Sequence, residues 1–527
     1  MQSLLQYHRL NHKVRDGYQH CPDTTGLHHL VQVSSGSSVV SVLADGEDGT
    51  DPRRWQRIRR IRATVIVWLL VFSQGWVSTS TSKITKSAAH EFHVLTTMQM
   101  LATALFMIGL GLGALVAGPV SETIGRNPVY LSSTLLLLSF CLGTALSPNI
   151  GAEITFRFLS GLASSPTLSI YGGSLADMFD KHQRRSIWPV FALAPLLGPL
   201  SAPVANAWMI QQGLSWRWPL EVALAFAGSA FLLALSFLPE TYSPILLLWK
   251  ARCLRKVYRD DRFAAPIEQA EALPRRLKRN LKQPFNFFRS ELIIILLGGY
   301  LILILFINLN FLSGFGVIFS KTYGLSTGTA SLAFVSIAGG ISIDVALTPL
   351  YIRLARRILW SRLRIFVSKK YWDREDTGVE KTYAELIASP PPEMSLLRAF
   401  VGAPFLPISL FWLGWTNNPS ISPASGYIAA TVYGYSFSAI FLSAYQYIID
   451  SYETHSSSAL GSITTARYLI AGPLCVATKP MYKALGVSWS LTVVGTIGLL
   501  LVPVPWALMR YGHVVRQRSA VARTIVD

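Results

Sequence analysis

The chain has 527 residues, of which 51% are hydrophobic and 14% are charged, and its formal net charge is +19 at pH 7. Soluble domains carry about 25% charged residues, so this composition excludes an ordinary soluble enzyme and a disordered protein. The four cysteines are widely spaced and form no C-x-x-C pair, which argues against a zinc site or a disulfide framework. The excess of basic residues would fit nucleic-acid binding or a membrane surface, and the positions of the charges decide between these.

Long apolar stretches recur along the whole sequence. A helix needs about 20 mostly apolar residues to cross the hydrocarbon of a bilayer. The alternating segments that are typical of a membrane β-barrel are not found in the sequence. We therefore expect an all-α integral membrane protein with twelve transmembrane helices. In chain order these are predicted at 63–82, 97–118, 128–147, 154–176, 187–210, 218–238, 293–319, 328–350, 398–415, 426–449, 458–480 and 487–509.

The Lys and Arg residues predict the orientation of the spans. With both termini placed in the cytosol, 38 of the 47 Lys and Arg residues fall in cytosolic tails and loops, and 6 fall on the opposite side. The remaining three, Arg157, Arg398 and Arg467, lie within spans. This asymmetry follows the positive-inside rule. It explains the basic charge by contact with anionic lipid, so no nucleic-acid partner is expected. The plasma membrane is the expected location, and the vacuolar membrane is the alternative.

A basic segment of about 50 residues divides the spans six and six, as in transporters built from two repeats. The first 62 residues are polar and lack the apolar core of a secretory signal, so we expect a disordered tail there. The predicted organisation is a cytosolic tail 1–62, a six-helix bundle 63–238, a central cytosolic loop 239–290, a second six-helix bundle 291–509 and a cytosolic tail 510–527.

The two halves share a faint sequence pattern. Each ends its fourth span with an aspartate and carries a Gly-Pro pair in its fifth span. These residues are Asp177 with Gly198-Pro199 in the first half, and Asp450 with Gly472-Pro473 in the second. The pattern favours two six-helix pseudo-repeats.

The first predicted cytosolic loop reads Gly118-Pro-Val-Ser-Glu122-Thr-Ile-Gly125-Arg126-Asn-Pro128. Its glycines allow close helix approach and unusual backbone angles. Glu122 and Arg126 are charges at a membrane edge, and they need partners there. A carboxylate at this point would be favoured against the positive end of a neighbouring helix, whereas the alternative is a plain solvated loop.

This loop resembles the G-x-x-x-[DE]-x-x-G-R-[RK] signature of the major facilitator superfamily. The chain from about residue 51 to about residue 512 resembles the fungal drug:proton antiporters with twelve spans, the group of polyamine and azole-resistance exporters. Supporting stretches are Asp51-Pro-Arg-Arg-Trp55, Phe156-Arg-Phe-Leu-Ser-Gly161, Gly172-Gly-Ser-Leu-Ala-Asp177, Pro195-Leu-Leu-Gly198-Pro199, Leu238-Pro-Glu-Thr-Tyr242 and Phe411-Trp-Leu-Gly-Trp-Thr416. The resemblance implies the major facilitator fold.

The resemblance also implies roles for individual residues. Glu122, Arg126 and Asp177 would form a charge relay that holds the cytosolic side shut, and Glu240 would brace the end of span six. Asp450 and Arg467 would be the partners in the second half. The remaining implied positions are the turn glycines Gly118 and Gly125, the span-five hinge Gly198-Pro199, and Arg157 in proton coupling.

Ionisable and polar residues inside the spans are functional candidates, because burying them in a membrane is costly. Arg157 has a structural alternative, in which it pairs with a carboxylate or with backbone carbonyls. Asp344 would carry a proton or bind a cationic substrate, or else pair with Arg353 or Arg356 near the interface.

A substrate site near the midplane would draw on polar and aromatic side chains of both halves. Asn308 and Asn310 are about 200° apart on a helix, so only one of them is expected to face a cavity. Hydrogen bonding between helices is the alternative role for such residues. The candidate cavity residues are Asn206, Asn308, Asn310, Phe315, Tyr433, Tyr445 and Gln446.

These features predict a secondary active transporter that exports small amphipathic or cationic organic compounds by alternating access. Drugs, polyamines and a fungal secondary metabolite are the substrates considered. The sequence has no ATP-binding G-x-x-x-x-G-K-[ST], H-E-x-x-H or G-x-S-x-G motif. We therefore expect no enzymatic activity, no metal and no cofactor, with the proton gradient as energy source and a monomer as the working unit. A proton-independent facilitator or nutrient importer of the same fold, and a non-transporting membrane sensor, are the alternatives.

Overall fold

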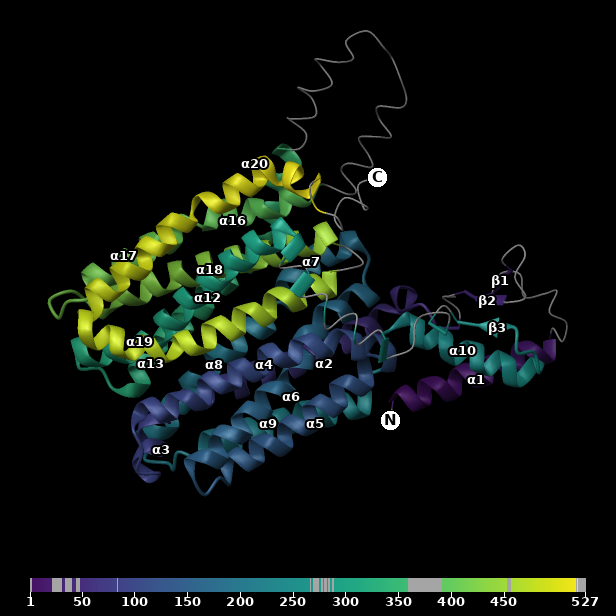
Figure 1. Cartoon of the computed structure of the whole chain (residues 1–527), viewed down its shortest axis with the longest axis horizontal. Helices are drawn as coiled ribbons and strands as arrows, with labels where there is room; N and C mark the ends of the chain where they lie inside the picture. Colours follow the sequence, from purple (N-terminus) through teal and green to yellow (C-terminus); the bar gives the residue numbers. More distant parts are fainter. Residues whose placement is uncertain are drawn as a thin grey trace, which may run out of the picture.

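A computed structural model describes residues 2–20, 31–33, 40–43, 48–82, 84–265, 267–268, 274–275, 278, 282, 285–286, 289–358, 391–452, 456–517 and 519. These residues are mainly helical. The long helices run together as one bundle, in which the first half of the chain lies beside the second (Figure 1).

The first half contains the six predicted long helices. A side-chain cap starts one of them, because the Asn149 side chain accepts a hydrogen bond from the Ala152 backbone N–H. The helices are α2 (Arg57–Thr79), α4 (Thr96–Ile124), α5 (Arg126–Ala145), α6 (Ile150–Met178), α8 (Leu193–Gln211), which follows α7 (Lys181–Phe191), and α9 (Trp218–Phe237). A short helix, α3 (Thr85–Glu91), lies between α2 and α4.

The second half follows the same scheme with two differences. The predicted span 458–480 and the first part of the predicted span 487–509 lie in one 46-residue element, which is interrupted at Gly486, where φ is +74°. The last part of the span 487–509 lies in the helix that follows. The predicted span 398–415 is divided in two. The elements are α12 (Leu292–Phe315), η3 (Gly316–Lys321), α13 (Thr327–Ala346), η4 (Pro392–Leu396), α16 (Leu397–Gly402), α17 (Phe405–Thr416), α18 (Pro423–Tyr452), α19 (Ser456–Leu501) and α20 (Pro503–Gln517).

Eleven helices of the described residues are long and apolar enough to cross a membrane. The remaining predicted span is α6, which is 29 residues long but carries Glu153, Arg157 and Asp177. This helix packs against α2, α4 and α5. Helices that carry ionisable residues in a membrane turn them toward the interior of a bundle, so the position of α6 accounts for its composition.

Glycines allow the second and fourth helices of each half to cross closely. A Cβ atom on Gly161 of α6 would lie 2.0 Å from the Phe106 carbonyl oxygen of α4. In the second half, a Cβ atom on Gly340 of α13 would lie 1.9 Å from the Thr431 carbonyl oxygen of α18. Small residues at such crossings are the usual way in which membrane helices approach one another. The repeated crossing supports the expected two-fold repetition of the chain.

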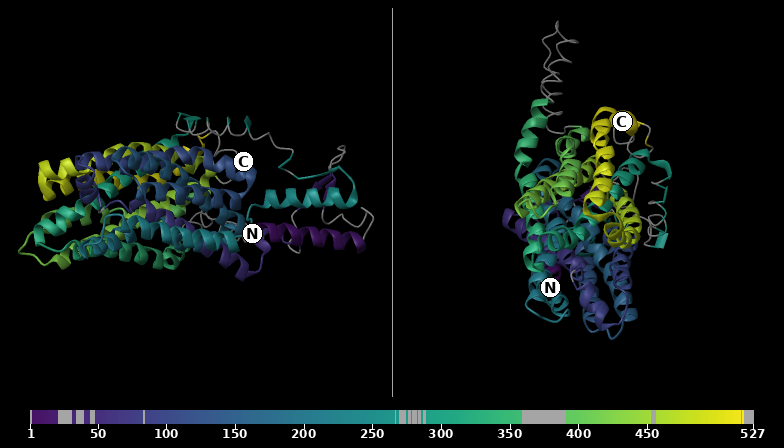
Figure 2. Two further views of the ribbon diagram at one scale, coloured as in Figure 1. Left: turned by 90° about the horizontal axis from the view of Figure 1, so that it is seen from below. Right: turned by 90° about the vertical axis from the view of Figure 1, so that its left-hand side faces the viewer.

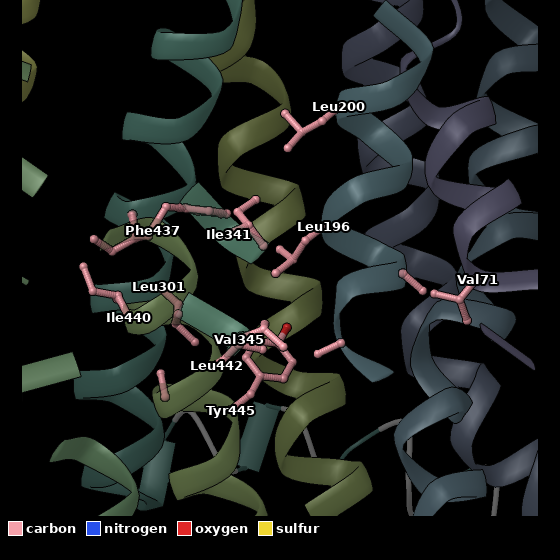
Figure 3. Packing of buried hydrophobic residues seen from close by; sticks show 14 of the residues in the cluster. Val71, Leu196, Leu200, Leu301, Ile341, Val345, Phe437, Ile440, Leu442 and Tyr445 are labelled. Carbon is pink, nitrogen blue, oxygen red and sulfur yellow. The ribbon is translucent and has the colours of Figure 1, made fainter. Parts of the chain in front are cut away.

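The two halves meet mainly through α4 with α19 and through α8 with α13. The Thr465 hydroxyl donates to the Gly111 carbonyl oxygen across the first contact, at 3.0 Å. In the second contact Leu196 of α8 lies beside Ile341 and Val345 of α13 in Figure 3, and all three side chains are buried. The Gly328 backbone N–H of α13 also donates to Gln211 Oε1 of α8, at 2.9 Å. Much of the core therefore lies between the halves.

The N-terminal segment differs from the expected disordered tail. Residues Gln2–His20 form α1, which lies along α10 (Ser243–Tyr258) beyond one end of the bundle (Figures 1 and 2). The Tyr7 ring contacts the Trp249 ring edge-on at 5.8 Å. The tail acquires order from these contacts with a distant part of the chain, which its polar composition does not reveal. Residues 21–30, 34–39 and 44–47 lie outside the described residues.

A small sheet completes this accessory region. Its order is β1-β2-β3, with β1 antiparallel to β2 and β2 parallel to β3. The Lys250 ammonium of α10 is buried and lies 2.6 Å from the Asp48 carboxylate, so an ion pair fastens the tail to the central segment. The strands are β1 (Val31–Val33), β2 (Val40–Val42) and β3 (Phe263–Ala264).

Candidate functional site

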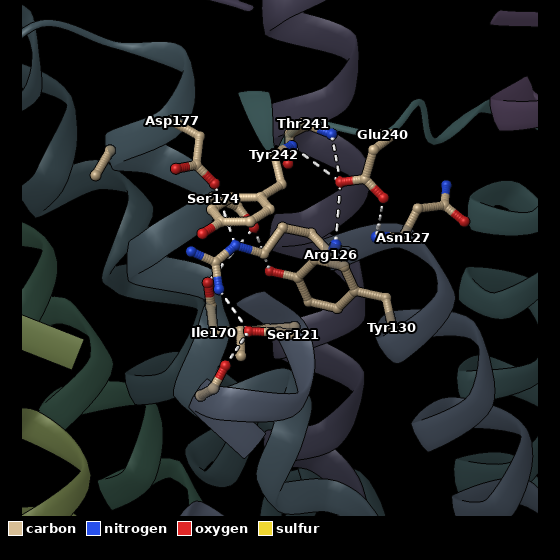
Figure 4. A network of polar contacts seen from close by, with 12 residues as sticks. Ser121, Arg126, Asn127, Tyr130, Ile170, Ser174, Asp177, Glu240, Thr241 and Tyr242 are labelled. Atoms are coloured by element: carbon tan, nitrogen blue, oxygen red, sulfur yellow. Dashed lines mark hydrogen bonds and ion pairs between the residues drawn. The ribbon is translucent and has the colours of Figure 1, made fainter. Parts of the chain in front are cut away.

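Arg126 begins α5 at the end of the bundle where α10 leaves it, which we call the Arg126 end. Its Nε lies 3.1 Å from the Asp177 carboxylate of α6, and its Nη1 donates to the Ser121 hydroxyl at 2.5 Å (Figure 4). The guanidinium carbon lies 4.9 Å from the centre of the Tyr242 ring. Glu122 adds a like charge that acts on Asp177. The relay predicted from the loop signature is therefore brought together at this end.

Glu240 holds the start of α5 from the other side. Its carboxylate accepts backbone N–H groups of Arg126 at 3.0 Å and Asn127 at 3.1 Å, and also those of Thr241 and Tyr242 at 2.9 Å each (Figure 4). Negative charge is favoured at this position because the N-terminus of a helix carries partial positive charge. Burial raises the pKa of the Glu240 carboxyl, and the hydrogen bonds from these N–H groups oppose that rise.

The two turn glycines of the loop differ. Gly125 has φ of +107°, and a Cβ atom there would lie 2.5 Å from Glu240 Oε2. Both the backbone angle and the lack of space therefore require glycine at this position. Gly118 has open space around its Cα and makes no close helix contact, in contrast to the expectation. Gly198 of the predicted hinge does pack closely, because a Cβ atom there would lie 2.5 Å from the Phe72 carbonyl oxygen. Pro199 also lies in α8 and its carbonyl oxygen accepts the Thr79 hydroxyl at 2.9 Å.

The second-half pair Asp450 and Arg467 is placed differently from the expectation. Asp450 lies 3.8 Å from Arg185 of α7 and accepts a hydrogen bond from Gln446 at 2.9 Å. The first contact joins the two halves at the Arg126 end. Arg467 instead lies among aromatic rings, because it sits about three turns into α19 while Asp450 is near the end of α18.

Arg157 is buried and binds the end of α2. Its guanidinium donates to the carbonyl oxygens of Val77 at 3.2 Å and Ser78 at 3.1 Å, and to the Thr81 hydroxyl at 2.8 Å. Carbonyl groups at the C-terminal end of a helix favour a cation. The structural alternative considered for this arginine, contact with backbone carbonyls, is thus the arrangement found.

Asn206 of α8 binds the same end of α2. Its Nδ2 donates to the Ser80 carbonyl oxygen at 2.8 Å, and the side chain is fully buried. This cavity candidate therefore hydrogen-bonds between helices of one half, which was the alternative role considered for it.

Glu153 is a buried carboxylate that our sequence analysis missed. It lies one turn before Arg157 on α6, and its Oε1 accepts a hydrogen bond from Gln99 of α4 at 2.6 Å. The residue stands immediately before the predicted span 154–176, so it was counted with the preceding loop. The Asn149 cap is the sequence signal that would have placed it inside the helix.

Asp344 of α13 pairs with Arg398 of α16 at 3.4 Å and accepts a hydrogen bond from the Ser438 hydroxyl of α18 at 2.9 Å. The expected alternative partners Arg353 and Arg356 are exposed and lie more than two turns further along the chain. The sequence analysis placed Arg398 inside a span but gave it no partner. The pair is fully enclosed by the second half.

The other cavity candidates lie on α12 and α18. The Tyr433 hydroxyl donates to Asn308 Oδ1 at 3.2 Å, while Asn310 bonds to its own helix through the Phe306 carbonyl oxygen at 3.0 Å. Of these two asparagines, Asn308 is the one whose side chain forms a hydrogen bond with another helix. Tyr445 is buried beside Arg467, and the side chain of Phe315 lies outside the described part of the chain. Among the residues described, no group of His, Cys, Asp and Glu side chains could hold a metal ion.

A family comparison identifies this arrangement. The model of the Major Facilitator Superfamily matches residues 67–474. The chain belongs to this superfamily. It is therefore an integral, multi-pass membrane transporter protein, and a family of transporters is consistent with the expectation of no enzymatic activity.

Fungal transporters are among the proteins similar to this chain. It is 38% identical to the MFS-type transporter kojT of Aspergillus flavus, over 96% of this chain and 87% of that protein. It is 30% identical to the MFS-type efflux pump MFS2 of Trichophyton rubrum, over 90% and 76% of the two chains. Among solved structures, the xylose transporter XylE of E. coli has a TM-score of 0.56 at 15% identity, over 86% of this chain and 97% of the other. This last likeness concerns the fold alone.

Proposed function

We propose that this transporter exports small amphipathic organic compounds in exchange for protons, through alternating access of the two halves. The observation that carries the proposal is the set of charge contacts at the Arg126 end. There Asp450 of the second half meets Arg185 of the first, beside the network of Arg126, Asp177 and Glu240. Such contacts must separate before a site between the halves can open at this end. The names of relatives such as the efflux pump MFS2 support the outward direction.

The Arg126 end is proposed to face the cytosol. The basic residues of α10, including Arg252, Arg255 and Lys256, leave the bundle at this end, and the positive-inside rule places them in the cytosol. The plasma membrane is the proposed location and the vacuolar membrane is the alternative. No cofactor is required in this scheme, because the proton gradient supplies the energy, and a monomer suffices.

Proton coupling is proposed to use a buried carboxylate. Asp344 is fully buried against Arg398, so taking up a proton would weaken that pair and free the guanidinium to move. Glu153, fully buried one turn from Arg157, is the second candidate. Arg157 itself keeps its charge permanently and would act on Glu153 through its field.

The test measures flux of labelled amphipathic compounds into inside-out vesicles with and without an imposed proton gradient. We expect gradient-driven uptake by the unchanged protein and its loss in Asp177→Asn, Arg126→Ala and Asp344→Asn. Asp260→Asn is the matched control, since this half-buried aspartate pairs with Arg262 in a loop outside the bundle.

Each contrary result has a distinct meaning. Flux that ignores the gradient would show a facilitator or importer, and binding without flux would show a sensor. Equal loss of flux in Asp260→Asn would remove the assignment of the gate, because that variant leaves the Arg126 end intact.

A further inference from the structure

Four arginines are buried among the described residues, and three of them have carboxylate or backbone carbonyl partners that compensate the charge. Arg126 pairs with Asp177, Arg398 pairs with Asp344, and Arg157 binds backbone carbonyls. Arg467 is the exception, because no ion pair joins it to a carboxylate within the part of the chain that the structure describes. Its side chain is 5% exposed, its guanidinium hydrogen-bonds to the Tyr468 hydroxyl, and its Nε has no hydrogen-bond partner.

Aromatic side chains surround this guanidinium. Its carbon lies 5.2 Å from the ring centre of Phe441, 5.6 Å from that of Tyr445 and 4.8 Å from that of Tyr468. Tyr171 of α6, in the first half, lies close enough to interact with it electrostatically. The charge thus sits where the two halves of the bundle meet.

A continuous row of rings leads to the guanidinium along α18. Four aromatic residues at every fourth position stack on one another, with centre-to-centre distances of 6.2, 6.0 and 4.4 Å and interplanar angles of 10°, 25° and 29°. In order these are Tyr433, Phe437, Phe441 and Tyr445. At the far end of the row, Tyr433 bonds to Asn308 of α12. Figure 3 shows Phe437 and Tyr445 on the same helix, among side chains of α8 and α13.

The free-energy cost of burying the Arg467 charge favours an anion beside it. A buried guanidinium without a counter-charge is costly in a membrane protein. Contacts with ring faces offset part of that cost at a desolvated site, and hydrogen bonds with a bidentate carboxylate are stronger. A flat anion would supply both a counter-charge for the guanidinium and a surface for the neighbouring rings.

We infer that Arg467, with Tyr171, Tyr445 and Tyr468, forms the binding site for a planar organic anion, such as an aromatic carboxylate or an enolate. This rests on the proposed function, because it names the substrate class of the exporter's central site. It differs from the cationic substrates considered from the sequence. The site draws on both halves, so the rocking that alternating access requires would open it.

Three probes with the same ring separate charge from shape: 1-naphthoate, the neutral 1-naphthamide and 1-naphthylmethylammonium. Binding of each is measured by calorimetry on the purified full-length protein in detergent. We expect 1-naphthoate to bind most tightly, and Arg467→Gln to weaken it by at least about tenfold, as loss of a charge-assisted hydrogen bond predicts. Arg467→Lys keeps the charge without the planar fork and should give an intermediate loss.

Arg510→Gln is the matched control. Arg510 also lies over aromatic rings, at 5.7 Å from both Trp506 and Tyr511, but it is exposed. This variant should bind all three probes as the unchanged protein does, and its unliganded melting temperature should show a folded protein. The same unliganded melting measurement identifies an Arg467 variant that has not folded, and Arg467→Lys then decides the question.

Several outcomes overturn the inference. They are absence of 1-naphthoate binding, tighter binding of 1-naphthylmethylammonium, and an equal loss of all three probes in Arg467→Gln. Binding at equilibrium needs no gradient, so anion binding through Arg467 with no gradient-driven flux in vesicles would refute only the export proposal. Proton-driven flux of compounds that bind independently of Arg467 would refute only the anion site.

Discussion

The two halves of the bundle repeat their packing but not their charges. In each, the second and fourth helices cross at glycines, Gly161 in the first half and Gly340 in the second, whose Cβ atoms would collide with backbone oxygens of the neighbouring helix. The buried cations differ: Arg157 binds carbonyl oxygens of α2, whereas Arg398 pairs with Asp344. The shared crossings define the helix packing of both halves. The buried charges are not repeated, so we expect the two halves to have different roles in transport.

The largest expected loss of stability comes from breaking the buried ion pair of Asp344 and Arg398 in the second half. Asp344→Leu leaves Arg398 buried without its counter-charge, and removing one partner of such a pair costs about 3–5 kcal/mol. Thermal unfolding in detergent should show a large fall in melting temperature. The double variant Asp344→Leu with Arg398→Met should recover most of it, since both charges are then gone. If the double variant is no more stable than the single one, the pair is not the source of the loss.

The next largest loss of stability is expected at two glycines with positive φ, one in each half. Gly125 has both φ of +107° and the Glu240 carboxylate against it, whereas Gly486 has φ of +74° and open space. Gly486→Ala should cost about 1–3 kcal/mol for the backbone alone, because φ of +74° with ψ of 179° is a conformation that is essentially restricted to glycine. Gly125→Ala should cost more, by about 1–3 kcal/mol, because the methyl group also displaces Glu240. Equal melting temperatures for the two variants would show that the contact at Gly125 contributes nothing.

The sequence was sufficient for the fold because membrane spans are encoded locally. A run of apolar residues is visible without knowledge of its neighbours, so the twelve spans and the six-and-six division were predictable, and eleven of the described helices are apolar enough to cross a membrane. The contact of Arg126 with Asp177 was expected from the resemblance to a family signature, which gave the relay as Glu122, Arg126 and Asp177 and Glu240 as a brace. The helix α1 was not, since its order comes from contacts with residues more than 200 positions away, such as Tyr7 with Trp249 of α10 and Gln6 with the Glu240 backbone before α10.

The partners of the buried charges could not be predicted from the sequence either. Arg398 and Asp344 are 54 residues apart, and no pattern in the sequence links them. Arg467 was expected beside Asp450 by analogy with the first half, but its depth in α19 places it with Phe441 and Tyr468 instead. Pairings of this kind depend on the height of each residue in the bundle, which shifts by 1.5 Å for every residue of error in a helix boundary.

Two adjacent glycines test the packing that the halves share. Gly340→Ala brings a methyl group to within 1.9 Å of the Thr431 carbonyl oxygen, whereas Gly339 has open space. Overpacking at the crossing should cost about 1–3 kcal/mol in Gly340→Ala, while Gly339→Ala should gain up to about 1 kcal/mol from helix propensity. Gly161→Ala should behave like Gly340→Ala if the two crossings are equivalent. Melting temperatures of the three variants make the comparison, and a stable Gly161→Ala would mean that only the second half depends on its crossing.

The smallest effect concerns an exposed charge pair, in contrast to the buried one of the second half. Glu91 lies 2.7 Å from Arg217, with side chains 45% and 33% exposed, and it also accepts a hydrogen bond from the Trp216 ring. These donors lower the pKa of the Glu91 carboxyl, that of Trp216 most. A carboxyl with a lowered pKa stabilises the folded state above its unfolded pKa of about 4.3, and loses that contribution as the pH falls through the folded value. Solvent screening limits the contribution to less than about 1 kcal/mol.

Glu91→Gln should therefore melt slightly below the unchanged protein at pH 7, and the difference should disappear near pH 3. A difference that persists at pH 3 would assign the effect to packing of the side chain rather than to its charge.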